Sequence, residues 1–574
     1  MAEYDVLIQG GTVVDGSRTP RFMGDVGIKD GKIAKIEPNG KLNPSDAKKT
    51  LDANGLVVAP GFIDLHTHYD AQINWDPYVT LSGWHGVTSI VLGNCGFGFA
   101  PMKPEMRERA MLTMSRVEAI PYESMKAGMK WDWVTFPEWL DFLDQTPKGV
   151  NVLSFVPIAP IMIWTMGLEA AKSRPATDKE KQTMRQILSE SLDAGGCGFS
   201  AQRLGDGFVS VQRDYDGTPM VTDTMADEDV LSFGRVLKER GEGFIQLTQS
   251  SPDFEADMRF YDRLADECGR PILFNATATR DDRPSIHRRI LRWMEKTNKA
   301  GRKIYNQTAT FRQGLYFSFA DMSGLFDGND VLREVTMGTP AERLEKLKNP
   351  AIRQALVAEY DTGHTPVVTG SLKDFTVETV KNEKFEKFIG KTVEEVAKME
   401  NKHVIDAMFD IAVEENLETE FYTPARNVRE DYVSELMSSP YSMAGVSDGG
   451  AHTKFITIGA YPTDMLTWMV RDAGFMSLEE AHYRLSAMPA QCAGFQNRGV
   501  LQEGARADVV VYDLENLKLT PEKPKVVHDF PGGEWRRVQY AEGYRWIMVN
   551  GDVTFEDGNC TGATPGHLLR HGRD

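Results

Sequence analysis

The chain has few cysteines and none in a pattern typical of cross-links or clusters. Its five cysteines are scattered through 574 residues, and no two of them form a Cys-x-x-Cys pair. This distribution argues against a disulfide framework, a zinc ribbon and a dithiol redox motif. We therefore expect a reducing, cytoplasmic location.

Long apolar runs and positive charge are also scarce. The first residues lack the basic stretch followed by an apolar stretch of a secretory signal, and no later run is long enough to span a bilayer. Lysines and arginines total 65 against 83 aspartates and glutamates, a formal net charge of -18. Such an acidic chain is poorly suited to neutralise nucleic-acid phosphates. We expect a small-molecule substrate, and neither a membrane nor a nucleic acid as partner.

Both ends of the chain predict small β structures. Short apolar stretches with strand-like alternation fill residues 4–60, and residues 505–559 have the same character. Dipeptides typical of tight turns separate these stretches. They are Gly10-Gly11, Asp15-Gly16, Asp30-Gly31 and Asp557-Gly558.

The middle of the chain alternates apolar runs with helical stretches, which predicts a parallel α/β sheet. The runs lie at 86–94, 151–160, 195–201, 243–249, 270–276 and 302–310, and clear helical stretches lie at 178–195 and 227–243. The number of repeats favours a (β/α)8 TIM-like barrel, whose active site lies at the carboxyl ends of its strands. Residues 319–446 are too long for an ordinary loop and predict a helical insertion, either a lid or packing outside the barrel.

Polar residues that suit a metal site follow several of these apolar runs. His66 and His68 are two positions apart, so on a strand both imidazoles point to the same side and can bind one ion. Cys95 follows an apolar run in a glycine-rich loop, where it is either a thiolate ligand or a buried apolar residue. Asp448 follows another run, and can bind metal and accept a proton from water, or simply form a turn.

Three motifs in this order resemble one branch of the amidohydrolase superfamily, the N-acyl-D-amino-acid deacylases or D-aminoacylases. They are HTH at 66–68, GNCGFGFAP at 93–101 and SDGGAH at 447–452, and the likeness extends to TGATPGHLLR at 561–570. The resemblance implies a barrel over 61–496 with a lid-like insertion at about 319–446. It also implies a small β-sandwich domain built from residues 1–60 and 497–574.

The resemblance further implies a zinc site and roles for its residues. His66, His68, Cys95 and Asp448 would be metal ligands, with Cys95 in the place of a carboxylated lysine and Asp448 also the catalytic base. The implied reaction is amide hydrolysis. Asp448 takes a proton from a metal-activated water and delivers it to the leaving nitrogen.

The sequence departs from this family at two later strand ends, where the D-aminoacylases carry one histidine each. The corresponding runs offer amides, which are poor ligands for zinc. These amides are Gln246, Gln249 and Asn275, and the next run adds Asn306 and Gln307. We favour a single Zn²⁺ or other divalent ion; the alternative is a weakened or absent metal site. Candidate substrate-binding residues are Gln249, Asn275, Gln307 and Arg312.

These observations leave three functions open. The leading hypothesis is a metal-dependent hydrolase that cleaves the amide bond of an N-acyl amino acid or a similar small acylated compound. The same apparatus also suits a cyclic amide, a lactone or a carbamate. The third is a metal-poor binding or scaffold protein. By analogy with the superfamily, we expect a homo-oligomer.

Overall fold

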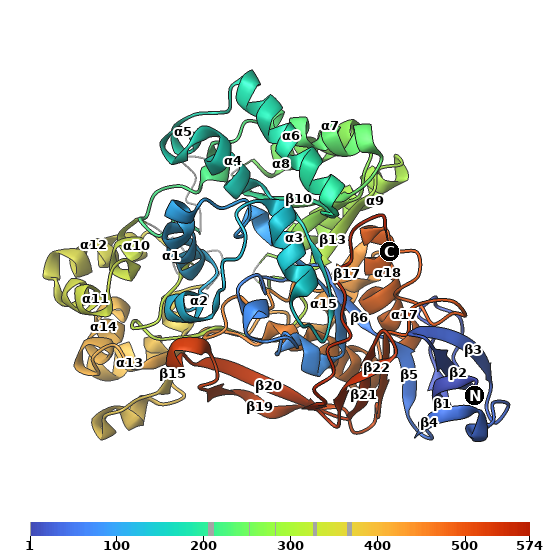
Figure 1. The fold of residues 1–574 in the computed structure, drawn as a ribbon. Helices are drawn as coiled ribbons and strands as arrows, with labels where there is room; N and C mark the ends of the chain where they lie inside the picture. The colour runs from blue at the N-terminus through green and yellow to red at the C-terminus, as the bar shows by residue number, and fades with distance from the viewer. Residues whose placement is uncertain are drawn as a thin grey trace.

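Strands from both ends of the chain pair in one nine-stranded sheet (Figure 1). The structure is a computed structural model that describes residues 2–204, 212–251, 253–281, 283–324, 330–363 and 370–573. The sheet order is β23-β22-β21-β18-β5-β1-β2-β3, and β4 pairs with β1. Its strands are β1 (Tyr4–Val13), β2 (Phe22–Lys29), β3 (Lys32–Pro38), β4 (Ala47–Asp52), β5 (Val57–Pro60), β18 (Val509–Tyr512), β21 (Tyr544–Val549), β22 (Asp552–Glu556) and β23 (Asn559–Cys560). The antiparallel pair β5–β18 joins the two ends of the chain.

Asp-Gly turns connect neighbouring strands of this sheet, as predicted. Asp30 (φ 49°) and Gly31 (φ 73°) lie between β2 and β3. Asp557 (φ 49°) and Gly558 (φ 77°) lie between β22 and β23. Positive φ at both central residues is typical of the type I′ hairpin turn, which matches the twist of the flanking strands.

The predicted turn at Gly10-Gly11 is wrong, because both residues lie inside β1. The pairing of β1 with β2 shifts register between Ile8 and Gly11. A Cβ atom on Gly11 would lie 2.4 Å from the side chain of Val58. Glycine is needed here because β1 is irregular and the Val58 side chain lies close to its backbone.

The middle of the chain forms parallel strands, in agreement with the predicted alternation. One sheet has the order β6-β7-β8 and the other β17-β13-β12-β11-β10-β9. The strands are β6 (Phe62–Asp64), β7 (Val87–Leu92), β8 (Asn151–Ser154), β9 (Val156–Pro157), β10 (Gly198–Arg203), β11 (Phe244–Gln249), β12 (Ile272–Thr277), β13 (Ile304–Thr308) and β17 (Ser442–Ala444). Only Phe155 separates β8 from β9. A parallel bridge between Thr67 and Gly449 links the residues that follow the outermost strands, β6 and β17.

Helices connect these strands and cover them (Figure 1). The two predicted helical stretches are confirmed as α6 and α7. Thr177 and Glu180 form a capping box at the start of α6, and Gly195 ends it in the left-handed region. The helices of this part are α1 (Arg107–Val117), α2 (Tyr122–Gly128), α3 (Phe136–Gln145), α4 (Ile158–Met166), α5 (Leu168–Ser173), α6 (Asp178–Ala194), α7 (Asp227–Arg240), α8 (Phe254–Cys268), α9 (Ser285–Lys299), α16 (Tyr461–Asp464), α17 (Leu478–His482) and α18 (Met488–Ala493).

The segment between β13 and β17 has a small sheet and a hydrophobic core of its own. Its helices are α10 (Asp330–Thr336), α11 (Pro340–Lys348), α12 (Pro350–Tyr360), α13 (Val393–Glu400), α14 (Val404–Glu414) and α15 (Glu430–Ser438). The sheet has the order β14-β16-β15, with β14 at Tyr316–Phe317, β15 at Thr376–Thr379 and β16 at Glu420–Tyr422. Phe317, Phe409 and Phe421 pack in its core. Helices α10–α14 lie on the side of the molecule opposite to β1–β5 (Figure 1).

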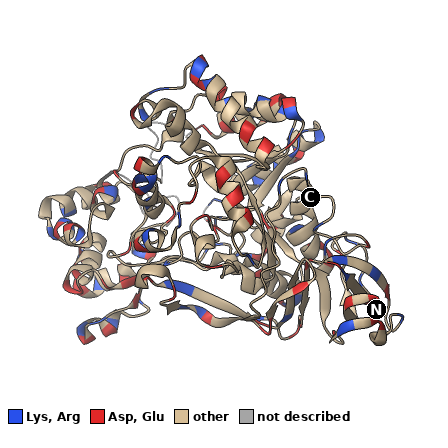
Figure 2. Cartoon of the chain, in the orientation of Figure 1, with Lys and Arg blue, Asp and Glu red and all other residues tan. Residues whose placement is uncertain are grey.

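Charged residues of both signs are interspersed on the outer helices (Figure 2). A hairpin of β19 (Lys518–Val527) and β20 (Arg536–Glu542) runs along one side of the molecule (Figure 1). Among the described residues, no helix combines the length and the apolar character needed to cross a bilayer.

Candidate metal centre

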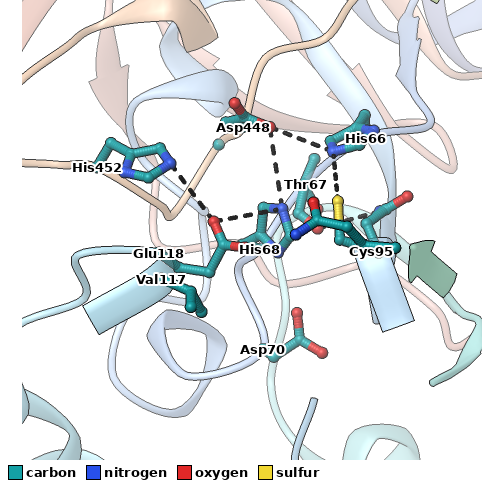
Figure 3. A network of polar contacts seen from close by, with 12 residues as sticks. His66, Thr67, His68, Asp70, Cys95, Val117, Glu118, Asp448 and His452 are labelled. Carbon is teal, nitrogen blue, oxygen red and sulfur yellow. Dashed lines mark hydrogen bonds and ion pairs between the residues drawn. The ribbon is translucent and has the colours of Figure 1, made fainter. Parts of the chain in front are cut away.

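His66 and His68 lie directly after β6, at the carboxyl end of the strand, and both are 1% exposed. Hydrogen bonds fix the backbone around them. Asp64 accepts the His66 amide at 3.0 Å, and Gly449 O accepts the His68 amide at 2.7 Å. Thr67 points the other way and donates its hydroxyl to Val91 O. Both imidazoles therefore face one interior space, as their spacing predicts (Figure 3).

Cys95 reaches the same space from the loop after β7. Gly93 (φ 73°) turns the chain out of the strand, and Cys95 itself has φ 56°. The Cys95 amide donates to Gln246 Oε1 at 2.6 Å, and Cys95 Sγ lies 3.6 Å from His66 Nε2. The ligand atoms of His66, His68 and Cys95 all lie within 4.8 Å of one another. This grouping can hold a metal ion.

Asp448 adds a carboxylate from the turn after β17. Its Oδ1 atom lies 3.2 Å from His66 Nε2 and 3.9 Å from His68 Nε2. Asp448 has φ 46°, and the next residues are glycines, of which Gly450 passes so close that a Cβ atom would lie 2.6 Å from His68 O. The Asp448 side chain is 26% exposed, whereas those of the two histidines are 1% exposed. The carboxylate is thus the part of the cluster that solvent or a substrate can reach.

The charges of the cluster depend on burial and on one another. Burial and the neighbouring charge of His66 lower the pKa of His68 to about 3, which keeps its nitrogen lone pair free at neutral pH. Burial raises the pKa of the Cys95 thiol. Burial acts to raise the pKa of Asp448, but the hydrogen bond and charge of His66 outweigh it and hold that pKa below its ordinary value. Two imidazoles, a thiol and an ionised carboxylate fit a zinc-type ion.

Two further residues of the cluster were missed from the sequence, Glu118 and His452. Glu118 Oε2 lies 3.7 Å from His68 Nε2 and 3.5 Å from His452 Nε2 (Figure 3). Burial, and then the charge of Asp448, raise the pKa of Glu118 to about 8. One signal for Glu118 was available. It follows Met111 and Met114, both buried, at helical spacing, so that its charge falls on the apolar face of α1.

Gln307 and Asn275, predicted to bind substrate, lie beside the cluster. Gln307 Oε1 is 3.2 Å from His66 Nδ1, the nitrogen turned away from Asp448. Asn275 donates to Thr248 Oγ1 at 3.0 Å, and that hydroxyl lies 3.7 Å from Cys95 Sγ. The carboxyl ends of β11 and β12 thus present a hydroxyl and an amide where the sequence lacks histidine.

The other two predicted substrate residues contact different groups. Gln249 Oε1 accepts from Arg203 Nη2 at 2.8 Å, and Gln249 Nε2 donates to Asp257 at 2.9 Å. Arg312 Nη2 lies 2.6 Å from Asp464 Oδ1. The structure thus places Gln307 and Asn275 next to the cluster, and gives Gln249 and Arg312 partners outside it.

A pocket opens beside Asp448 and His452. Its walls come mainly from the chain after β13 and from the segment before α15, and include one cation, Arg426. The remaining wall residues are Ala278, Ala309, Phe311, Gln313, Gly314, Leu315, Thr423, Pro424, Asn427, Ile456 and Ile458. The Asp448 carboxylate therefore stands between the buried histidines and a space that can receive a small molecule.

A family model described as "Amidohydrolase family" matches residues 49–554. The chain belongs to the amidohydrolase family. Two relatives that match nearly the whole length of the chain are named as deacylases. An N-acyl-D-aspartate deacylase of Alcaligenes xylosoxydans xylosoxydans is 24% identical over 587 residues, covering 100% of this chain and 96% of the relative. A D-aminoacylase of the same organism is 26% identical over 581 residues, covering 99% and 97%.

Solved structures of this amidohydrolase branch share the fold. A crystal structure of D-aminoacylase has a TM-score of 0.67 at 22% identity, covering 99% of this chain and 100% of that chain. An N-acyl-D-glutamate deacylase from Bordetella bronchiseptica, complexed with zinc and a phosphonate inhibitor, has a TM-score of 0.65 at 22% identity, covering 99% of both chains. The resemblance inferred from the HTH, GNCGFGFAP and SDGGAH motifs is confirmed.

Proposed function

We propose that the protein is a metal-dependent hydrolase that releases an amino acid from an N-acyl amino acid. The observation that carries this proposal is the joint placement of His66, His68, Cys95 and Asp448. The first three form a buried group of potential ligands, while the Asp448 carboxylate borders the pocket. Names of full-length relatives, N-acyl-D-aspartate deacylase and D-aminoacylase, support an N-acyl-D-amino acid as the substrate class.

The metal in this proposal is a single Zn²⁺ or similar divalent ion held by His66, His68, Cys95 and Asp448. When bound, such an ion supplies Lewis-acid polarisation of the substrate carbonyl and of the attacking water. A single ion is favoured because the neighbouring strand ends offer Thr248 and Asn275, a hydroxyl and an amide, which are weak ligands for zinc.

Asp448 moves the proton in this scheme. Its carboxylate is ionised at neutral pH, because its pKa is held below the ordinary value, and it is exposed on the pocket side. It accepts a proton from the attacking water while the water oxygen bonds to the carbonyl carbon. It then gives that proton to the amide nitrogen as the C–N bond breaks. The immediate products are a carboxylic acid and a free amine; at neutral pH the acid proton passes to the amine, which leaves a carboxylate and an ammonium group, so atoms and charges balance.

The pocket fits a substrate that carries a carboxylate of its own. Arg426 lines the same space as Asp448. A guanidinium can pair with the α-carboxylate of an acylated amino acid in bidentate fashion. Phe311, Leu315 and Ile456 line the pocket as well and can contact the apolar part of the molecule.

We further propose the (β/α)8 barrel over 61–496 with the composite β domain of 1–60 and 497–574. In this barrel, β8 and β9 act as one strand between β7 and β10. The Thr67–Gly449 bridge between the outermost strands supports closure. The insertion would then act as a lid, since its Gly314, Leu315 and Thr423 flanks line the pocket.

A substrate panel tests the proposed function. Purified protein is loaded with Zn²⁺, Mn²⁺ or Co²⁺ and assayed with N-acyl-D- and N-acyl-L-amino acids, cyclic amides, lactones and carbamates. We expect free amino acid to appear from N-acyl substrates in a chelator-sensitive manner, and Arg426→Gln to raise KM for them. If only lactones or cyclic amides are hydrolysed, the enzyme acts on those bonds and the proposed N-acyl amino acid substrate is wrong.

A further inference from the structure

The residue at the end of α1, Glu118, places a buried carboxylate beside the Nε2 atom of His68. Glu118 is 2% exposed, and its Oε2 atom is 3.7 Å from His68 Nε2 and 3.5 Å from His452 Nε2. In the part of the chain that the structure describes, no lysine or arginine forms an ion pair with it. A buried carboxylate is costly unless a cation or several donors compensate its charge. An ion bound at this point would compensate the charge of its ionised form.

Glu118 could either orient His68 or bind the metal ion itself. The ring nitrogen of His68 that it faces distinguishes these two roles. A carboxylate that only orients a metal-bound histidine contacts the ring nitrogen turned away from the metal. Glu118 instead faces His68 Nε2, the same nitrogen that faces Asp448 Oδ1 at 3.9 Å. His68 Nδ1, on the other side of the ring, is buried without a hydrogen-bond partner. Glu118 therefore stands on the side of the ring where an ion would bind.

The backbone holds Glu118 and the Asp448 turn together. The His452 amide donates to Glu118 O at 2.6 Å, and the Ala451 amide donates to Asp448 O at 2.8 Å. His452 Nε2 also lies near the Glu118 carboxylate on the side away from His68 (Figure 3). The carboxylate thus lies between two imidazoles.

The separations between neighbouring donor atoms suit one coordination sphere. Adjacent ligand atoms about 2.0 to 2.3 Å from a four- or five-coordinate zinc lie roughly 3 to 4 Å apart. The His68–Glu118, His66–Asp448 and His66–Cys95 separations are 3.7, 3.2 and 3.6 Å. On the opposite side of the cluster, Thr248 offers only a hydroxyl. The remaining strong donor is therefore Glu118.

We propose that Glu118 is a direct ligand of the divalent ion held by His66 and His68, and that His452 positions its carboxylate. The inference rests on the proposed metal-dependent function and extends its ligand set to the loop after α1. The coordination of the ion then involves four separate parts of the chain: the segment after β6, the loop after β7, the end of α1 and the turn after β17.

Metal binding by the full-length chain tests this ligand assignment without any assay of activity. Zn²⁺ affinity is measured by chelator competition for the wild type, Glu118→Gln and Glu415→Gln, and Co²⁺-loaded samples give visible spectra. Glu415 is the matched control, a buried glutamate (6% exposed) whose carboxylate accepts the Asn382 amide in the insertion. We expect Glu118→Gln to weaken Zn²⁺ binding by about 10-fold or more and to change the Co²⁺ bands, with Glu415→Gln like the wild type.

Glu118→Asp and His452→Gln complete the test. Glu118→Asp retains the charge and is expected to bind Zn²⁺ more tightly than Glu118→Gln; it also decides the matter if Glu118→Gln does not fold. His452→Gln is expected to weaken binding less than Glu118→Gln, since it only positions the ligand. Wild-type affinity and an unchanged Co²⁺ spectrum in Glu118→Gln would overturn the ligand role alone. A wild type that takes up no divalent ion would overturn the proposed function with it.

Discussion

His66 Nε2 lies 3.2 Å from Asp448 Oδ1, although the two residues follow the first and the last of the parallel strands. Two contacts between the segments that carry them hold them in place. The Ser447 hydroxyl donates to His66 O at 2.9 Å, and the Thr67–Gly449 bridge lies between the same two segments. The pairing of the outermost strands therefore sets the distance between a predicted ligand and the predicted base.

Asp448→Asn should remove the proton acceptor and leave the turn intact. An amide has nearly the same shape as a carboxylate, but it cannot take a proton from water. We expect kcat for an N-acyl amino acid to fall by roughly 100- to 10,000-fold, the usual contribution of a general base. Steady-state kinetics at saturating metal measure this. A variant that retains more than a tenth of wild-type kcat would contradict the role of Asp448.

Cys95→Ser should weaken metal binding, because a hydroxyl is a much poorer zinc ligand than a thiolate. We expect the Zn²⁺ dissociation constant to rise by about 10- to 100-fold, comparable to losses at other metal-supporting positions. Cys492→Ser is the matched control, since Cys492 is also buried and packs in a hydrophobic core. Equal Zn²⁺ affinity of the two variants would show that Cys95 is only a buried apolar residue.

The carboxyl ends of β11 and β12 offer a site for added ligands. Thr248 Oγ1 lies 3.7 Å from Cys95 Sγ, and Asn275 Nδ2 lies 3.0 Å from Thr248 Oγ1. The double variant Thr248→His, Asn275→His would place two imidazoles next to the thiol. We expect its metal content to rise from about one toward two ions per chain, measured by elemental analysis after dialysis. Unchanged stoichiometry would mean that these positions do not face the metal.

Several features of this site follow from the sequence because they depend on short-range order. The spacing of His66 and His68 requires only that the chain leave β6 in an extended form. The placement of Cys95 and Asp448 after apolar runs follows from the rule that sites in parallel α/β folds gather at the carboxyl ends of strands. The amidohydrolase likeness added the order of these motifs and gave the family correctly.

Other features depend on contacts that sequence patterns do not contain. Glu118 belongs to the site only because the end of α1 packs against the turn that carries His452. Arg312 follows a strand as substrate-binding residues often do, but it pairs with Asp464, which is distant in sequence. Gly10 and Gly11 look like a turn in the sequence, and the approach of Val58 explains their presence inside β1 instead.

A buried histidine far from the cluster predicts a loss of stability in acid. His482 Nε2 lies 2.7 Å from Tyr512 Oη, and burial lowers the pKa of His482 to about 3. The unfolded chain takes up a proton on this histidine below about pH 6.5, and the folded chain does not. Folding stability therefore falls as pH drops from about 6.5 toward 3. This one group accounts for about 1 kcal/mol between pH 7.5 and pH 5.5.

His482→Phe removes this titration and keeps a ring in the same place. Between pH 7.5 and pH 5.5 we expect the free energy of unfolding of this variant to fall by about 1 kcal/mol less than that of the wild type. Denaturant unfolding at the two pH values measures the difference. Parallel pH dependence of the two proteins would refute the low pKa of His482.

The most direct test of a metal-dependent amidohydrolase centred on His66 compares His66→Ala with His85→Gln. His85 is a fully buried histidine that contacts Thr463 and Gln539 outside the cluster. Both proteins are dialysed, analysed for zinc and assayed for the release of amino acid from an N-acyl-D-amino acid. We expect His66→Ala to lose both zinc and activity, and His85→Gln to retain both. Stoichiometric zinc or undiminished hydrolysis in His66→Ala would contradict a metal centre at His66.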